Sequence, residues 1–141
     1  MAALLSVEDV SVDYRTARGA VRAVDRASFA VPEGAVVGLV GESGCGKTTA
    51  GRAIVRLLEP TSGSVKFDGV ELAHGTGPKP GPLLSGEALR RLRQRFQMIF
   101  QDPYSSLNPR MTIAAIVGEP LEIHGIGSRA ERRDRIANLL E

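Results

Sequence analysis

The chain has 141 residues, of which 43% are hydrophobic and 24% are charged, as is typical of one soluble globular domain. No run of about 18 uncharged apolar residues is present, so the sequence predicts no membrane-spanning helix. The net charge is only +2, and four Phe and two Tyr offer few rings for stacking on bases, which argues against a nucleic-acid partner. The one cysteine excludes an internal disulfide and fits a reducing cytoplasm.

The first part of the chain carries the pattern of a β-hairpin. Residues 7–14 alternate between apolar and polar side chains, which predicts a half-buried strand, and residues 21–31 predict a second strand. The turn falls at residues 16–20, and we expect the two strands to pair antiparallel. The expected faces are Val10, Val12 and Tyr14 on one side of the first strand, Ser11 and Asp13 on the other, and Val24, Phe29 and Val31 as core residues of the second.

Residues 35–40 have a different pattern, because they form an uninterrupted run of apolar residues and glycine. Such a run is typical of a strand that is covered on both faces in a parallel sheet. After a glycine-rich loop, apolar residues recur at helical spacing over residues 47–59, which predicts a helix that ends before Pro60. The apolar positions of this helix are Ala50, Ala53, Ile54, Leu57 and Leu58.

The remaining predicted elements are short. In chain order we expect a strand at 64–67 with a turn at 68–69, a surface loop at 74–82, a helix at 86–93, a strand at 96–100, an extended loop at 101–110, and helices at 112–117 and 129–141. Ser128 is expected to cap the last helix, because Glu131 follows three residues later.

One motif carries chemistry. Residues 41–48 read GESGCGKT and match G-x-x-x-x-G-K-[ST], whose chance occurrence in a chain of this length is roughly one in a hundred. Its glycines allow backbone N–H groups to converge on phosphate oxygens at the start of a helix. Lys47 supplies a positive charge, and Thr48 offers a hydroxyl to Mg²⁺. Cys45 is interpreted as a small residue at a free position, with a redox-sensitive switch as the alternative.

Three segments together resemble one family. They are GESGCGKTT at residues 41–49, LLEPTSGSV at 57–65 and MIFQDPYSSLNPRMT at 98–112. The first is similar to the phosphate loop of the ATP-binding subunits of ABC transporters, the second to the segment after their first helix, and the third to their Q-loop. The third segment looks most like the oligopeptide- and dipeptide-importer type of this subunit.

The resemblance implies an α/β fold, with a P-loop NTPase core, an N-terminal antiparallel β subdomain and the start of a helical subdomain. It implies that residues 1–141 are part of a single nucleotide-binding domain, with the core over about 1–110 and the helical part over 111–141. ATP and Mg²⁺ are the implied cofactors. The implied nucleotide-binding residues are Tyr14, which would stack on adenine, and Gly41, Glu42, Ser43, Gly44, Cys45, Gly46, Lys47, Thr48 and Thr49. Lys47 and Gln101 are the implied catalytic residues, and Thr48 and Gln101 the implied metal ligands.

The implied partners are the transmembrane subunits, whose coupling helix would lie near the loop after Gln101, and a second nucleotide-binding subunit. The implied location is the cytoplasmic face of the cell membrane.

The sequence also departs from the family pattern. No signature loop follows Gln101, since LSGE at residues 84–87 precedes it, and no apolar run ends in Asp-Glu to supply a general base. We therefore expect the first part of a longer subunit, which binds ATP and hydrolyses it poorly or not at all. A fragment of a soluble ATPase of the same family and a non-catalytic remnant are the alternatives.

Overall fold

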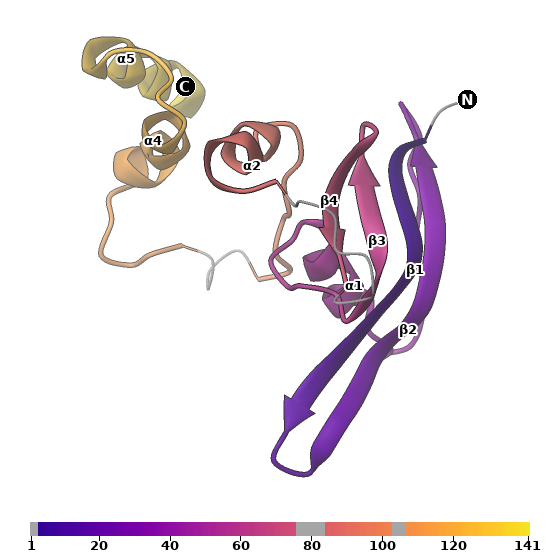
Figure 1. Ribbon diagram of the computed structural model, residues 1–141. Helices are drawn as coiled ribbons and strands as arrows, with labels where there is room; N and C mark the ends of the chain where they lie inside the picture. The colour runs from indigo at the N-terminus through magenta and orange to yellow at the C-terminus, as the bar shows by residue number, and fades with distance from the viewer. Residues whose placement is uncertain (1–2, 76–83, 103–106) are drawn as a thin grey trace. The chain divides into compact units, whose positions relative to one another are not determined.

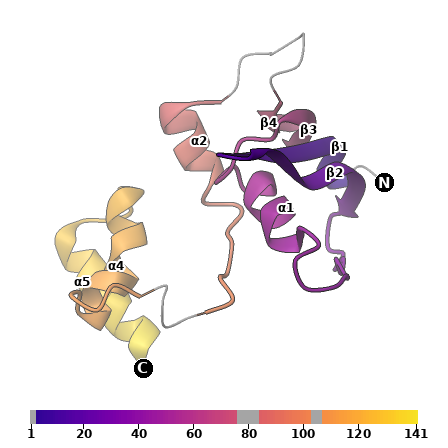
Figure 2. The ribbon, with the colours of Figure 1, turned by 90° about the horizontal axis from the view of Figure 1, so that it is seen from below.

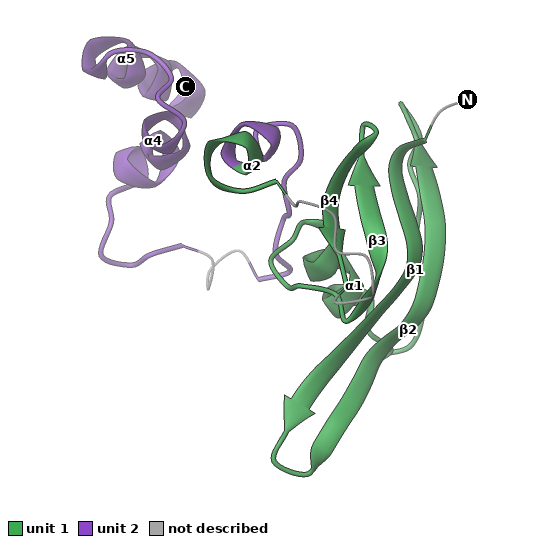
Figure 3. Ribbon diagram, in the orientation of Figure 1, with its two compact units in different colours: residues 1–89 green, residues 90–141 purple. Residues whose placement is uncertain are grey.

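The computed structural model describes residues 3–75, 84–102 and 107–141. The chain divides into two compact units, Met1–Leu89 and Arg90–Glu141 (Figure 3), and each is described by itself. Most of the loop predicted at residues 74–82 lies outside the described residues, as does part of the loop predicted at 101–110.

The first unit contains a four-stranded antiparallel sheet (Figure 1). Its strands are β1 (Ala3–Thr16), β2 (Gly19–Pro32), β3 (Ser62–Phe67) and β4 (Val70–His74), in the order β2-β1-β3-β4. The predicted hairpin at the start of the chain and the predicted strand and turn at 64–69 are therefore confirmed. Sequence reasoning missed β4, in which the adjacent residues Leu72 and Ala73 are both buried, so the strand lacks a regular alternation.

The β1–β2 hairpin is longer than the rest of the sheet. β1 pairs with β2 from Ala3 to Thr16, but it pairs with β3 only from Leu5 to Ser11. At the far end of the hairpin, residues 12–22, β2 is therefore the only described strand that pairs with β1. Figure 1 shows this end extending past β3 and β4. The predicted adenine-stacking residue, Tyr14, lies in this extension.

The core of the first unit is built from side chains of all four strands and of the helix Lys47–Ile54. Its buried members include Val10, Val12, Val24, Val65 and Leu72. Ser11 is also buried, against the predicted alternation, because the register of β1 shifts on either side of Val10. Its hydroxyl accepts a hydrogen bond from the Arg26 amide at 3.0 Å, which satisfies the polar group. Phe29 and Val31, predicted as core residues, are only half-buried.

Helix α1 (Lys47–Ile54) lies across one face of the sheet (Figure 2). It buries Ala50 and Ala53. The predicted helix over residues 47–59 is too long, because the chain turns after Ile54: Arg56 has a φ of 53°, and the amides of residues 57 and 58 both bond to the Arg52 carbonyl. Leu57, one of the apolar positions of the predicted helix, lies beyond its end and is 55% exposed.

The strand predicted at residues 35–40 is not formed. These residues pair with none of the described strands, and Val36 and Val40 are 100% and 92% exposed. The strand predicted at 96–100 is also absent, and Ile99 is 95% exposed. A strand of a parallel sheet needs a hydrogen-bonding neighbour, and within the described residues β1 to β4 pair only with one another. Both segments are rich in apolar residues, but apolar composition alone does not provide a neighbouring strand.

Helix α2 (Gly86–Leu92) spans the boundary between the units, and the second unit holds α4 (Ile113–Ile123) and α5 (Arg129–Leu140). The Thr112 hydroxyl accepts from the Ala115 amide at the start of α4, which continues past the predicted end at residue 117. The predicted capping box of α5 is confirmed: the Glu131 amide donates to Ser128, and the Ser128 amide donates to the Glu131 carboxylate at 2.7 Å. No helix in the described ranges is long and apolar enough to cross a membrane.

Candidate functional site

The glycine-rich loop at residues 41–46 leads directly into α1. Its Cys45 amide donates to the Glu42 carbonyl oxygen at 3.3 Å, so the loop closes on itself as a turn before the helix begins. Gly44 and Gly46 have φ values of 83° and 94°, a region that strongly favours glycine. The glycines at positions 44 and 46 therefore match the backbone conformation that this turn requires.

The ammonium group of Lys47 lies over the turn. It donates to the carbonyl oxygens of Gly41 and Glu42 at 2.7 and 2.6 Å, and it lies 3.5 Å from the Cys45 sulfur. The side chain is thus folded back over the loop rather than extended into solvent. A full positive charge is held beside the N-terminus of α1, where the helix dipole is also positive.

The first turn of α1 has backbone amides that no bond within the helix uses. The earliest bond within the helix runs from the Ala50 amide to the Gly46 carbonyl oxygen at 2.8 Å, and no side chain caps the helix at Gly46. The amides of Lys47, Thr48 and Thr49 precede that first bond. Uncapped amides at a helix start, together with a neighbouring ammonium, form a binding site for an anion.

Close packing against the hairpin fixes the position of the loop. A Cβ atom added at Gly46 would lie 2.2 Å from the Ala23 carbonyl oxygen and 3.4 Å from Val24 Cγ2. A Cβ at Gly44 would meet nothing within 4 Å. Gly46 is therefore required by the approach of β2, whereas Gly44 is required only by its own φ angle.

The phenol of Tyr14 reaches the first turn of α1. Its hydroxyl lies 3.4 Å from the Thr49 hydroxyl, and its side chain is partly exposed. The neighbouring Asp13 carboxylate accepts two hydrogen bonds from the Arg22 guanidinium at 2.9 and 3.2 Å. These hydrogen bonds and the charge of Arg22 hold the pKa of Asp13 below its usual value.

The structure therefore brings together most of the residues predicted from the sequence. Tyr14 and residues 41–49 lie around the start of α1, within the first unit. Gln101 lies in the second unit and is exposed, so its predicted role at the metal stays a prediction. Sequence reasoning did not single out the contacts of Asp13 with Arg22 and Thr61, which support the strand that carries Tyr14. The pairing register places Asp13 opposite Arg22, and a hydrogen bond joins the Asp13 amide to the Thr61 hydroxyl.

A small hollow lies behind the loop. It has a volume of about 170 Å³ and is lined mainly by apolar side chains of β2, residues 39–40 and α1. Pockets that enclose a ligand of nucleotide size are usually several hundred Å³ in volume. This hollow is therefore too small to enclose a ligand of nucleotide size.

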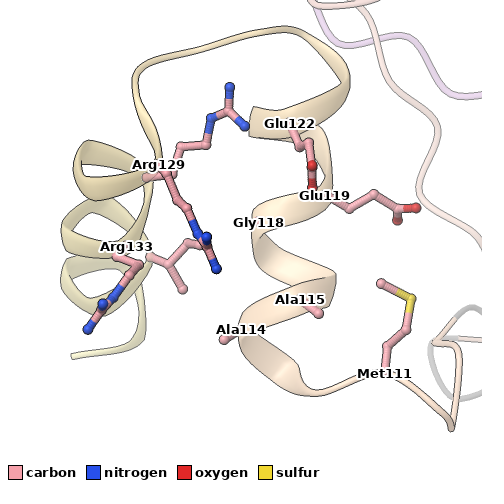
Figure 4. A pocket seen from close by; sticks show the side chains of 10 residues that line it. Met111, Ala114, Ala115, Gly118, Glu119, Glu122, Arg129 and Arg133 are labelled. Carbon is pink, nitrogen blue, oxygen red and sulfur yellow. The ribbon is translucent and has the colours of Figure 1, made fainter.

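A larger groove lies between α4 and α5 in the second unit (Figure 4). Its volume is about 610 Å³. Small residues of α4 form its floor, with glutamates of α4 and arginines of α5 around it; the lining residues are Met111, Ala114, Ala115, Gly118, Glu119, Glu122, Arg129, Arg132, Arg133 and Ile136. This groove therefore carries charged side chains of both signs.

Curated proteins resemble the chain over nearly its whole length. It is 49% identical to a putative peptide import ATP-binding protein of Brucella ovis, over 98% of this chain and 41% of that protein. It is 48% identical to the oligopeptide transport ATP-binding protein OppF of Bacillus subtilis, over 98% of this chain and 43% of that protein. The chain thus spans about two fifths of the length of these relatives.

Solved structures show the same fold. The dimeric ATP-binding cassette MJ0796, bound to ADP and Pi, superposes with a TM-score of 0.72 at 26% identity, over 95% of this chain and 54% of that one. An ATP-binding subunit of an ABC transporter superposes with a TM-score of 0.67 at 30% identity, over 97% of this chain and 49% of that one. The α/β fold predicted from the sequence is therefore confirmed. The sequence profile described as ABC transporter matches residues 24–141, and the chain accordingly belongs to the ABC transporter family.

Proposed function

We propose that this chain binds Mg²⁺-ATP in the loop at residues 41–48, as the nucleotide-binding portion of a subunit that energises the import of peptides. The observation that carries the proposal is the Lys47 ammonium, held over the turn by the Gly41 and Glu42 carbonyl oxygens at the uncapped start of α1. The names of the relatives, which are peptide import and oligopeptide transport proteins, support the choice of solute.

The donor set fits a triphosphate. The first-turn amides supply hydrogen-bond donors, and Lys47 supplies a positive charge. Glu42 is the one acidic residue of the loop that could compete with an anion for these groups. Thr48, the second residue of α1, would hold Mg²⁺ through its hydroxyl, and Gln101 would be a further ligand. The bound ion would neutralise phosphate charge. Tyr14 would stack on the adenine, as a partly exposed aromatic side chain beside the helix start.

The proposed partners are a membrane-embedded subunit and a second nucleotide-binding subunit, on the cytoplasmic face of the membrane. The groove between α4 and α5 supports a protein contact in the second unit, because it combines an apolar floor with carboxylates and guanidinium groups at its sides. A helix that carries charges of both signs would complement it. The segment after Gln101 is the other surface that we assign to this contact.

Calorimetric titration with Mg²⁺-ATP tests the nucleotide proposal. We expect Lys47→Ala to weaken binding at least tenfold, since hydrogen bonds to a charged group contribute about 1.5–3 kcal/mol each. Lys66→Ala is the matched control: Lys66 is also a lysine of the first unit, but it pairs with Glu8 on the sheet at 3.3 Å. Equal affinity of wild type and Lys47→Ala would overturn the proposal. We also expect slow release of phosphate, because no Asp-Glu pair follows an apolar run in this sequence.

A further inference from the structure

The contact between Tyr14 and Thr49 joins two parts of the proposed ATP site. Tyr14 lies on the far end of the β1–β2 hairpin, where β3 no longer pairs with β1. Thr49 lies in the first turn of α1, two residues after Lys47. Their hydroxyl oxygens are 3.4 Å apart, and either group can be the donor. Tyr14, which we expect to stack on the adenine base, is thus in contact with α1, whose first turn we expect to bind the phosphates.

The backbone at Tyr14 is held independently of this contact. Tyr14 pairs with Val21 across the hairpin. The preceding residue, Asp13, is fixed through its carboxylate by Arg22 and through its amide, which donates to the Thr61 hydroxyl at 2.8 Å. The remaining freedom at position 14 is rotation of the side chain. The hydroxyl of Thr49 is the group that restricts this rotation by a hydrogen bond.

We propose that Thr49 is a positioning residue, which orients the Tyr14 ring relative to the phosphate loop before the nucleotide arrives. This inference rests on the proposed function. A threonine hydroxyl has one donor and two acceptor sites. It can therefore accept from the Tyr14 hydroxyl and still donate to an anion at the start of α1. Holding the ring in place lowers the entropy that is lost when a base stacks on it.

A double-mutant cycle tests the coupling. Tyr14→Phe keeps the aromatic ring and removes the Tyr14 hydroxyl. Thr49→Val keeps the shape of the Thr49 side chain and removes its hydroxyl. Tyr14→Phe should weaken Mg²⁺-ATP binding roughly threefold, as the loss of one exposed neutral hydrogen bond implies. Thr49→Val should weaken binding by at least as much, because it also removes the hydroxyl that can donate to the anion. In the Thr49→Val background, Tyr14→Phe should have no further effect. Thr49→Ser, which retains the hydroxyl, should bind as wild type. Tyr14→Phe should leave the affinity for inorganic triphosphate, which has no base, unchanged.

A second readout needs no nucleotide. The chain has no Trp and only two Tyr, so Tyr104→Phe leaves Tyr14 as the sole intrinsic fluorophore of this kind. In that background, Thr49→Val should increase the quenching of Tyr14 fluorescence by acrylamide, and Thr49→Ser should not. Circular dichroism of each variant establishes that it is folded.

The outcomes separate this inference from the proposed function. Additive effects of the two changes on Mg²⁺-ATP binding, in a protein that still needs Lys47, would overturn the role of Thr49 and leave the proposed function intact. Unchanged quenching in Thr49→Val would also overturn it. If Lys47→Ala binds ATP as wild type does, the proposed function fails, and the quenching result alone still decides whether Thr49 orients Tyr14.

Discussion

Two glycines in the phosphate loop give a matched pair of substitutions. Gly44 and Gly46 both have positive φ, but they differ in their surroundings: a Cβ at Gly44 meets open space, whereas a Cβ at Gly46 would lie 2.2 Å from the Ala23 carbonyl oxygen. Gly44→Ala therefore tests the cost of the backbone conformation alone. Gly46→Ala tests the same cost together with the approach of β2.

The expected magnitudes follow from these two terms. A left-handed conformation costs an alanine roughly 1–2 kcal/mol, and this cost is common to both variants. A clash with backbone atoms cannot be relieved by a side-chain rotation, so β2 or the start of α1 must shift, at a further cost of about 1–3 kcal/mol. We therefore expect Gly46→Ala to lower the free energy of unfolding by about 1–3 kcal/mol more than Gly44→Ala does.

Urea unfolding followed by far-UV circular dichroism measures both variants beside the wild type. The midpoint for Gly46→Ala should be clearly lower than the midpoint for Gly44→Ala, with similar slopes. The Mg²⁺-ATP affinity of Gly46→Ala should also fall more, because the loop is displaced from the hairpin that carries Tyr14. Equal stability of the two variants would refute the conclusion that packing against Ala23 holds the loop in place.

Three further predictions concern the second unit. Ser128→Ala should destabilise α5 by about 1 kcal/mol, because it removes the cap, and the loss of helix signal on heating reports this. Hydrogen bonds from Ser128 hold the pKa of Glu131 below its ordinary value of 4.5. The ionised carboxylate therefore stabilises α5 above pH 4.5, and this contribution is lost as the pH falls further. Glu131→Gln should reduce the loss of ellipticity in acid, and an acid profile equal to that of the wild type would contradict this prediction. Gly118→Ala should change the melting temperature little, because the gain in helix propensity of about 1 kcal/mol offsets the displacement of Ile136 Cδ1, which lies 2.8 Å from the added Cβ.

Local signals in the sequence predicted local structure well. The Ser128 and Glu131 pair predicted a capping box, and the alternation before and after residues 16–20 predicted the β1–β2 hairpin. In each case the interacting groups are close in sequence. The motif at residues 41–48 likewise predicted a turn that leads into a helix, because its glycines permit the positive φ angles that the turn uses.

Predictions that depend on distant partners were less successful. The apolar run at residues 35–40 predicted a buried strand, but burial of a strand depends on neighbours that its own composition does not specify. The helix after Lys47 ends at Ile54, although the apolar spacing continues to Leu58, because the chain turns at Arg56. The supporting contacts of Tyr14 came only from the pairing register of the hairpin, which places Asp13 opposite Arg22.

Localising the bound phosphate by NMR tests the central claim most directly. Mg²⁺-ATP, and separately inorganic triphosphate, would be titrated into the isotope-labelled chain, with backbone amide shifts followed residue by residue. We predict the largest shifts for both ligands at residues 44–49, with a shift at Tyr14 for ATP alone. Shifts confined to the arginines of α5, or none at the loop, would contradict the assignment of residues 41–48 as the triphosphate site.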